Sequence, residues 1–536
     1  MCTTHAGTDL VRPGRTLFFA AMVATAVAGS IASTDTWAAF TCPKTGGDLN
    51  FGQEAKVNSL DMHASSTIST RNIAMHLFES LMTRDEDNNP ILELAESVST
   101  SPDGLVHTFK LRADIKFHNG KTMSSADVVA SFDRYKKLGV ERVILSNVAS
   151  WAAPDPGTFV VTMSKAQPTF LEDLSSFSVP IVIVPADNAS AEPLKLEPVG
   201  TGPFRFVEFI ADSHVKLARF DQFQPNKAYE TRTGFGGYKV ACLDSVTFRI
   251  VTEPGARVAG LETGELHAVE DVPQASVARL RENKAIKIIP YENFWIHLAT
   301  PNFARPPTDN PKVRMAIQTA LNLEEIMEAA TDGAYNLNCG FQQPNRKVFS
   351  KKGCEFFNIN DPARAKALLK ESGYKGEELI LLTNKDYSTM YNAALVMGEQ
   401  LKAIGMNVRL SVQDWPATIA TRDKQHDAWN YHFTGWGTNT SLGYLAVFKF
   451  LAMPNPIYNF KNPADSSPAF NKAYHDMLNK PTFDERAAAF AEVQRIVLEE
   501  GISLPFGWLT KNQAARANVN NFVPFRIPRM YNVSME

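Results

Sequence analysis

One acidic loop carries side chains that could bind calcium. Asp85, Asp87, Asn89 and Glu96 fall at positions 1, 3, 5 and 12 of an EF-hand-like loop, and calcium prefers oxygen ligands of this kind. Position 6 of such a loop needs the sharp turn that glycine makes, but this chain has Pro90 there, whose φ is fixed at a negative value. The loop is therefore interpreted as a solvated turn, and no metal site is predicted.

Catalytic signatures do not occur in the sequence. The patterns H-E-x-x-H, G-x-S-x-G, Walker A and G-x-G-x-x-G are all missing. The histidines are scattered, and none lies four residues from another, the spacing of a helical zinc site. We expect no catalytic residue, no metal and no cofactor. A secreted hydrolase remains only as an alternative of another class.

The cysteines predict two disulfides. Cys2 would leave with an N-terminal leader, so that Cys42, Cys242, Cys339 and Cys354 remain, an even number suited to an oxidising compartment. Three connectivities are open. A local bridge between Cys339 and Cys354 is favoured because the two flank a loop-like stretch, which leaves Cys42 with Cys242. Zinc is disfavoured, since no C-x2-C pair and no histidine cluster accompanies them.

The first 38 residues have the features of a secretory signal peptide. Two arginines precede an apolar, alanine-rich run at 17–28, and Thr36 and Ala38 supply small residues at the −3 and −1 positions of a cleavage site. A transmembrane anchor is the alternative, but the run is too short and too diluted by small and polar residues to span a bilayer. We expect removal of residues 1–38 and a soluble mature protein in the periplasm.

Length and charge bound the class of protein. The 536 residues correspond to about three to four domains. With 44% hydrophobic residues the chain can bury sizeable cores. The 54 basic and 57 acidic side chains nearly cancel, giving a net charge of −3. This balance argues against a nucleic-acid partner and against a polybasic membrane-surface protein.

Turn and cap signals define one hairpin region. The Ser-Pro-Asp-Gly run at 101–104 is a strong turn signal, and residues 105–112 after it alternate as a strand does. Asn-Gly at 119–120 marks a second tight turn. Ser124 and Asp127 resemble a capping box that opens a helix.

The rest of the chain mixes strands and helices. A strand at 379–382, a helix at 390–404 and a strand at 408–412 form a βαβ unit, whose strands should be parallel. We also expect strands at 204–209, 214–220 and 245–251, and helices at 72–82, 257–268, 312–330, from 361–362 to Gly373, and 484–498. The pattern predicts an α/β chain with at least two sheet systems.

Four stretches carry a resemblance to a known family. They are 78–81 with 90–95, 101–112 with 116–129, 199–204, and 311–317. With them the chain resembles the extracellular solute-binding proteins of family 5, the dipeptide- and oligopeptide-binding components of bacterial ABC importers. The stretches follow one another in the family's order over most of the mature chain. As turns and caps they identify the fold and not the ligand.

The resemblance implies a bilobal periplasmic-binding-protein fold of type II with an extra domain and two hinge crossovers, near 290 and 502. Lobe 1 would combine 43–75, 198–290 and 503–536, the appended domain would be 76–197, and lobe 2 would be 291–502. A monomer would trap a small molecule or peptide between its lobes by a domain motion and then dock on the permease subunits of an ABC transporter in the inner membrane.

The resemblance also implies a set of ligand contacts. It points to a segment after the first hinge, a Gly-Trp loop and a loop before a helix of lobe 2; two lobe 1 residues in a polar stretch are added from their composition. The residues are Asn293, Trp295, Trp436, Gly437, Thr438, Asn439, Tyr387, Ser388, Thr67 and Ser69.

Two departures from the family pattern bear on the ligand. Peptide-binding relatives pair the ligand ammonium with an aspartate three residues after the loop tryptophan, where this chain has Asn439. Dipeptide-binding relatives place an arginine near 386–389, where the nearest cation here is Lys385. A free dipeptide is thus disfavoured. A longer or modified peptide, an oligosaccharide, an opine-like compound or a metal chelate stays open, as does a sensory role.

Overall fold

The structure, a computed structural model, describes residues 39–536 except 179, 345, 347, 438–445, 449–450, 452–466 and 481. The predicted signal peptide lies outside the described residues. Residues 39–536 belong to one structural unit. None of the described helices is long and apolar enough to cross a membrane.

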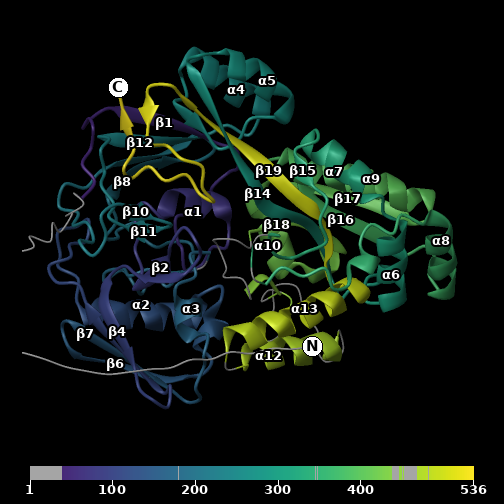
Figure 1. Cartoon of the computed structure of the whole chain (residues 1–536), viewed down its shortest axis with the longest axis horizontal. Coiled ribbons are helices and arrows are strands. Elements are labelled where there is room, and N and C mark those ends of the chain that lie inside the picture. Colours follow the sequence, from purple (N-terminus) through teal and green to yellow (C-terminus); the bar gives the residue numbers. More distant parts are fainter. Residues whose placement is uncertain are drawn as a thin grey trace, which may run out of the picture. The chain divides into compact units, whose positions relative to one another are not determined.

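The main sheet of the fold runs through eleven strands (Figure 1). These strands are β1 (Asp48–Gln53), β8 (Phe204–Ile210), β9 (His214–Arg219), β12 (Ser245–Ile250), β13 (Ala268–Val269), β14 (Ile286–Pro301), β15 (Tyr335–Asn336), β16 (Glu378–Asn384), β17 (Asn407–Gln413), β18 (Tyr431–Trp436) and β19 (Leu504–Arg516). Their order is β17-β16-β18-β14-β19-β13-β1-β12-β9-β8, and β15 pairs with β19. The three strands expected at 204–209, 214–220 and 245–251 are confirmed as β8, β9 and β12.

Two long strands, β14 and β19, join the parts of this sheet. We call β13, β1, β12, β9 and β8 the first half-sheet, and β17, β16 and β18 the second half-sheet. β14 pairs with β19 from Ile286 to Tyr291, and again from Trp295 to Ala299 after a register shift. Inside the shift Asn293 has a φ of +51°, which asparagine tolerates better than most residues. The two expected crossovers are therefore these strands, whereas the exact domain boundaries stay predictions.

Helices cover the second half-sheet on both faces. They are α6 (Pro311–Ala320), α7 (Leu323–Thr331), α8 (Pro362–Glu371), α9 (Ser388–Ala403), α10 (Trp415–Lys424), α12 (Pro468–Leu478) and α13 (Phe483–Glu499). In β16, Leu379 and Leu381 pack in the core that contains α9, whereas Leu382 packs in the core that contains α13. Because neighbouring residues of a strand point to opposite faces, α9 and α13 cover opposite faces of the sheet. Figure 1 shows this arrangement.

Several predicted elements of the second half-sheet are confirmed. β16 and β17 pair in parallel with α9 between them, which is the expected βαβ unit. α8 begins with Pro362 at its first position, and Gly373 beyond its end has a φ of +79°. The helix expected at 484–498 is α13.

Three predicted helices were wrong in extent. The helix expected at 312–330 is two helices, because Leu321 is extended and the side chain of Asn322 accepts the Glu325 N–H to cap α7. The helix expected at 257–268 is α4 (Pro254–Thr263), which ends at Gly264 in the left-handed region, so that residue 268 lies in β13. The helix expected at 72–82 is α1 (Ile68–Ala74), capped from Thr67.

A separate four-stranded sheet contains the predicted hairpin. It consists of β4 (Ala95–Thr100), β5 (Val106–Leu111), β7 (Thr158–Met163) and β6 (Val148–Asp155), in that order. The Ser-Pro-Asp-Gly turn joins β4 to β5, as predicted. α2 (Ser125–Leu138) begins with the predicted capping box, in which the side chains of Ser124 and Asp127 each bind the other's backbone.

The remaining short elements complete the chain. They are β2 (Met82–Arg84), β3 (Pro90–Leu92), α3 (Phe170–Leu174), β10 (Arg232–Thr233), β11 (Gly236–Gly237), α5 (Gln274–Glu282), β20 (Val519–Asn520), β21 (Ser534–Met535) and short 3-10 helices at 142–145, 354–356, 426–428 and 446–448. In the acidic loop between β2 and β3, the Asp85 carboxylate accepts the backbone N–H groups of Asp87 and Asn89, at 2.9 and 2.8 Å. This carboxylate therefore closes the turn.

Both predicted disulfides are confirmed. Cys42 is bonded to Cys242, and Cys339 to Cys354, with a Cα–Cα distance of 5.6 Å in each pair. The first joins a segment near the start of the described residues to the segment before β12, and the second closes the loop that precedes α8.

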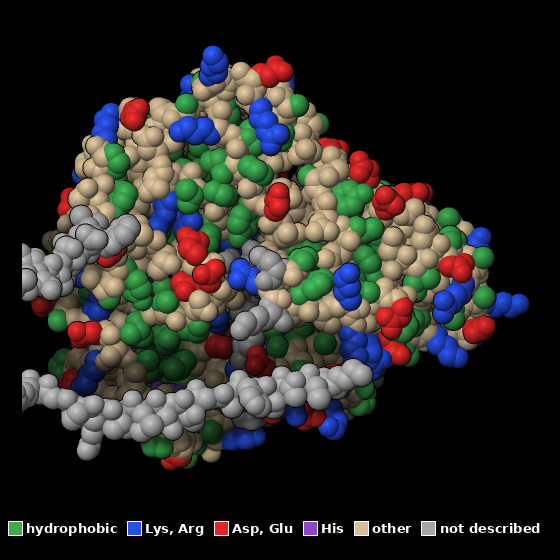
Figure 2. Space-filling model, in the orientation of Figure 1, with side chains coloured by type: hydrophobic (Ala, Val, Ile, Leu, Met, Phe, Trp, Pro, Cys, Tyr) green, Lys and Arg blue, Asp and Glu red, His purple; other side chains and the backbone are tan. Residues whose placement is uncertain are grey.

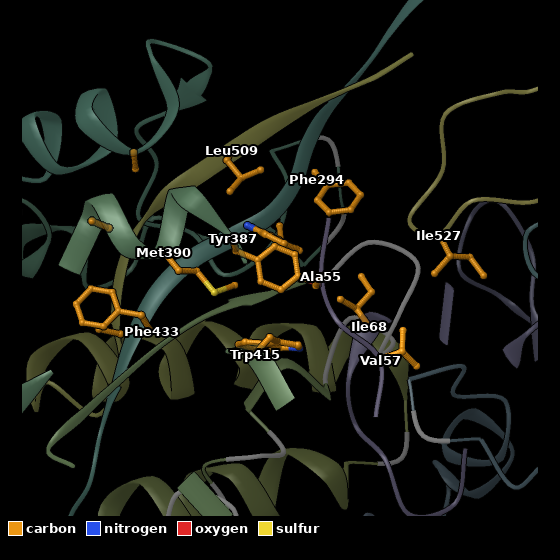
Figure 3. Packing of buried hydrophobic residues seen from close by; sticks show 14 of the residues in the cluster. Ala55, Val57, Ile68, Phe294, Tyr387, Met390, Trp415, Phe433, Leu509 and Ile527 are labelled. Atoms are coloured by element: carbon orange, nitrogen blue, oxygen red, sulfur yellow. The ribbon is translucent and has the colours of Figure 1, made fainter. Parts of the chain in front are cut away.

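One hydrophobic core extends under both half-sheets. It includes Val57, Ile68 and Ile527 beside the first half-sheet and Tyr387 and Trp415 beside the second. Figure 3 shows Ile68 and Val57 to the right of Tyr387 and Trp415, and Ile527 further to the right. On the face that Figure 2 displays, acidic and basic side chains are interspersed, as the small net charge predicts.

Candidate functional site

An aromatic cluster lies where the second half-sheet meets the crossing strands. The Trp295 ring on β14 contacts the Tyr387 ring edge-on, with centroids 5.8 Å apart, and Tyr387 contacts Trp415 in the same way at 5.3 Å. Phe294 adds a fourth ring, 4.9 Å from Trp295. All four side chains are buried. Such a wall suits stacking against a flat or apolar part of a ligand.

A buried carboxylate positions this aromatic cluster. One Asp386 oxygen accepts the backbone N–H of Trp415 at 3.2 Å and that of Lys56 at 3.3 Å. Asn384 accepts the Tyr387 N–H at 2.9 Å. Burial raises the pKa of Asp386 above its ordinary value. Because Lys56 follows β1 and Trp415 begins α10, Asp386 also ties the first half-sheet to the second.

A second group of candidate residues is a polar segment at the start of α1, from Ser65 to Thr70. The hydroxyl of Thr67 donates to that of Thr70 at 2.8 Å and accepts the Thr70 N–H, so it caps α1. Ser65 lies 3.0 Å from the Thr67 hydroxyl, and Thr70 in turn donates to the Ser59 carbonyl at 2.8 Å. The Ser69 hydroxyl is buried and has no partner among the described residues. Thr67 is thus used by the fold, whereas Ser69 is available.

Two buried arginines accompany these groups. Arg71 of α1 donates through one nitrogen to the carbonyls of Ser66 and Ser178, at 2.7 and 2.8 Å. The Arg526 guanidinium lies 4.5 Å from the centroid of Phe294 and 5.2 Å from that of Trp295. Burial lowers the pKa of Arg71 to about 9 and that of Arg526 to about 10, and the charge of Arg526 contributes to the shift at Arg71.

A buried ion cluster crosses from the first half-sheet to β19. Lys511 is paired with Glu54 and lies 3.5 Å from a Glu270 oxygen, and Arg257 lies 3.6 Å from Glu54. Burial raises the pKa of Glu54 to about 7 and that of Asp271 to about 6. Lys511 also lies 5.0 Å from the Trp295 centroid. The cluster therefore fixes β19 to the first half-sheet beside the aromatic wall.

A cavity of about 80 Å³ opens beside Tyr387, Ser388 and Lys511. Sites that hold small-molecule ligands usually measure about 300–1,000 Å³. In this conformation the cavity is too small for a peptide. Because the Asp386 carboxylate joins Lys56, which follows β1, to Trp415 of α10, a solute of that size needs the two half-sheets to separate.

The structure brings together only some of the predicted contact residues. Trp295 and Tyr387 meet in the aromatic cluster, and Ser388, the first residue of α9, lines the cavity. Asn293 uses its carbonyl to accept an N–H from Gln343 at 3.0 Å. As ligand contacts, all of them remain predictions.

The Gly-Trp loop has a different position. Trp436 ends β18 and is buried in a second core, with Ile296 and Trp508, on the side of α13. Gly437 after it is buried. Thr438 and Asn439 lie outside the described residues.

Sequence reasoning missed three residues of this region: Arg71, Trp415 and Arg526. One signal was available for Arg526, because it stands alone as a charge in the apolar run Phe-Val-Pro-Phe-Arg-Ile-Pro at 522–528. A lone charge in an apolar run is either paired or functional when buried. Trp415 follows Asp414 at a helix start, which by itself indicates a cap and not a site.

The comparisons with known proteins agree on one family. The family described as bacterial extracellular solute-binding proteins, family 5, middle region, matches residues 89–451. The glutathione-binding protein GsiB of Salmonella choleraesuis is 25% identical over 477 residues, which are 88% of this chain and 90% of that protein.

Solved structures share the fold. The periplasmic binding protein AgaA of A. tumefaciens R10, in complex with agropinic acid, is 24% identical with a TM-score of 0.80 over 91% of this chain and 99% of its own. The dipeptide-binding protein of Pseudoalteromonas sp. SM9913, in complex with Met-Leu, is 22% identical with a TM-score of 0.79 over 91% and 100%. These likenesses confirm the predicted bilobal type II periplasmic-binding-protein fold.

Proposed function

Because this chain belongs to the bacterial extracellular solute-binding proteins of family 5, we propose that it captures a peptide-like solute between its two half-sheets and delivers the solute to the permease of an ABC importer. One observation carries the proposal most directly. The aromatic side chains of β14, Tyr387 and Trp415 share one hydrophobic core with Ile68 of α1, and β14 and β19 connect the two half-sheets, where a domain motion would open and close the site.

The cellular setting belongs to the same proposal. Residues 1–38 would act as a cleaved signal peptide, and the mature monomer would work in the periplasm. The two disulfides suit that oxidising compartment. The family consists of solute-binding proteins, and we propose that this chain likewise leaves its ligand chemically unchanged.

Two observations support a proposal for the class of solute. GsiB is named for glutathione, a modified peptide, and this chain has Asn439 where peptide-binding relatives have an aspartate. Both points favour a modified peptide over a free dipeptide. An opine-like compound is the second candidate, because AgaA holds agropinic acid on the same fold.

Calorimetry on the mature protein tests this proposal. We expect one saturable site for glutathione or for agropinic acid, and weaker binding of the dipeptide Met-Leu. Mass spectrometry of the recovered solute should show it intact. Native mass spectrometry of the protein as purified would identify a retained ligand. A folded protein that binds none of these solutes, or one that returns them cleaved, would contradict the proposal.

A further inference from the structure

We propose that Arg71 and Arg526 together form an anion subsite that holds a carboxylate of the bound solute. The inference rests on the proposed function and names one chemical requirement of the solute. It is carried by the unpaired hydrogen-bond donors of these two side chains and by the position of Arg526 beside the aromatic cluster.

The first step is the state of Arg526. Its side chain is only 4% exposed, yet the structure gives it no hydrogen-bond acceptor and no carboxylate among the described residues. Its Nε and Nη1 atoms are both buried without a partner. The cost of burying a guanidinium is normally offset by an acceptor, and ring faces alone offset it poorly. A missing acceptor is therefore expected next to Arg526.

The second step compares the other buried arginines that the structure describes. Each of them has at least one acceptor. Carboxylates serve Arg134, Arg257, Arg422 and Arg529, and backbone carbonyls serve Arg71, Arg84, Arg232, Arg314 and Arg486. Among these buried arginines Arg526 is the exception, whereas Arg71 has two carbonyl acceptors and an Nε without a partner.

The third step concerns the neighbours. Trp295 Nε1 and the Tyr387 hydroxyl are also buried without a partner, and the Arg526 guanidinium lies 5.2 Å from the Trp295 centroid. The unpaired groups beside Arg526 can thus all donate hydrogen bonds. Glu270, the carboxylate whose charge acts on Arg526, is already held by Asn72 at 3.0 Å and by Lys511. A ligand with several acceptor oxygens fits this surplus of donors.

The fourth step identifies the chemical group. A guanidinium presents two parallel N–H donors that match the two oxygens of a carboxylate. A buried guanidinium without an acceptor is stabilised when an anion binds beside it. Family relatives that bind dipeptides place an arginine near 386–389, which this chain lacks. The subsite would therefore supply the carboxylate-binding arginine from the side of the first half-sheet, whereas those relatives supply it from the side of the second half-sheet.

The test uses pairs of solutes that differ in one carboxylate. Glutathione, agropinic acid and Met-Leu are each compared with forms whose carboxylates are blocked as esters or amides, by calorimetry. For at least one pair we expect the wild type to bind the free acid tenfold or more tightly than the blocked form. In Arg526→Gln and Arg71→Gln this preference should fall to about twofold or less, while the blocked form binds as it does to the wild type.

Two further variants keep the test decisive. Arg526→Lys retains the positive charge but lacks the two parallel N–H donors of the guanidinium, so it should keep part of the preference for the free acid. Arg232→Gln removes a buried arginine that binds only backbone and amide oxygens, at 2.6 to 3.3 Å, and should leave the preference unchanged. Circular dichroism verifies folding of each variant.

The outcomes separate this inference from the proposed function. Wild-type binding that is equal for acid and blocked forms would overturn the subsite and leave the proposed function standing. An acid preference that survives in folded Arg526→Gln and Arg71→Gln would also overturn it. If the folded wild type bound no member of any pair, the proposed function and the subsite would fall together.

Discussion

Arg134 and Arg526 are both buried arginines, but their surroundings differ in one respect. Arg134 of α2 donates two hydrogen bonds to the Asp61 carboxylate, at 3.1 and 2.7 Å. Lys239 is likewise a buried cation with carboxylate partners, because it lies 2.7 Å from oxygens of both Glu79 and Glu93. Arg526 has rings beside it and no ion pair with any residue that the structure describes. A paired buried charge belongs to the scaffold, whereas an unpaired one indicates a site that a ligand completes.

The largest effect is expected on the paired side of this comparison. Asp61→Ala leaves the Arg134 guanidinium buried without its anion and also removes the acceptor for the backbone N–H groups of His63 and Leu194. We expect a loss of about 3–5 kcal/mol in the free energy of unfolding. Urea denaturation measures it. A loss below about 1 kcal/mol would show that pairing with a carboxylate does not distinguish an arginine of the scaffold from one of a ligand site.

The next prediction asks whether packing and not charge carries ligand binding. Trp436→Ala should weaken solute binding several-fold if the predicted contact exists, since an aromatic anchor contributes about 1–3 kcal/mol. Because Trp436 lies in the core with Ile296 and Trp508, we also expect a loss of about 3 kcal/mol in stability. Calorimetry and thermal unfolding measure the two effects.

Trp429→Ala is the matched control for that variant. Trp429 lies in the same core and is not a predicted ligand contact. If both variants weaken binding equally, the effect comes from the core, and Trp436 is not a contact. If Trp436→Ala alone weakens it, the predicted contact is supported.

The unpaired side of the comparison predicts an unusual combination. Arg526→Met removes a buried charge that has no anion and keeps an apolar stem, so the ligand-free protein should be as stable as the wild type or more stable. Affinity for an acidic solute should fall about tenfold, or about 1.4 kcal/mol. Thermal unfolding without ligand measures the stability, and calorimetry with the acidic solute measures the affinity. A stability loss of several kcal/mol would place Arg526 with Arg134, in the scaffold.

The smallest expected effect concerns the buried ion cluster that joins β19 to the first half-sheet. Burial raises the pKa of Glu54 to about 7, above the value of about 4.3 in an unfolded chain. Between these pH values the folded protein holds a proton that the unfolded chain has lost. The stability contributed by this group is therefore greatest at low pH and declines as the pH rises toward 7.

Glu54→Gln tests this pH dependence. Glutamine cannot ionise, so the stability of the wild type relative to the variant should decline as the pH rises from 5 to 8. Urea denaturation at several pH values measures the difference. A difference that grows with pH would mean that the pairing with Lys511 and Arg257 outweighs burial.

Local rules predicted much of the fold. The capping box at Ser124 and Asp127, the proline start of α8 and the parallel βαβ unit each depend on a few neighbouring residues, and all are confirmed. The predictions failed where apolar periodicity continued across a break. Leu321 and Asn322 interrupt one apolar pattern, and only the cap on Glu325 separates the two helices.

The candidate site was predictable only in part. The family resemblance led to Trp295 and Tyr387, which do meet, but it also led to Trp436, whose side chain lies in another core. Arg71 and Arg526 carry no motif. A residue type says nothing about a partner that is absent, so an unpaired charge becomes visible only when every neighbour is in place.

The sequence by itself determined the family and most elements and favoured the disulfide pairs that the structure has, because those features depend on short-range residue order and on a pattern shared with relatives. The tertiary structure alone decided which buried charges are paired. Folding places Arg526 beside the aromatic cluster, and it gives Glu270, the carboxylate whose charge acts on Arg526, to Lys511 and Asn72. Pairing depends on distances across the fold, and residue order does not contain those distances.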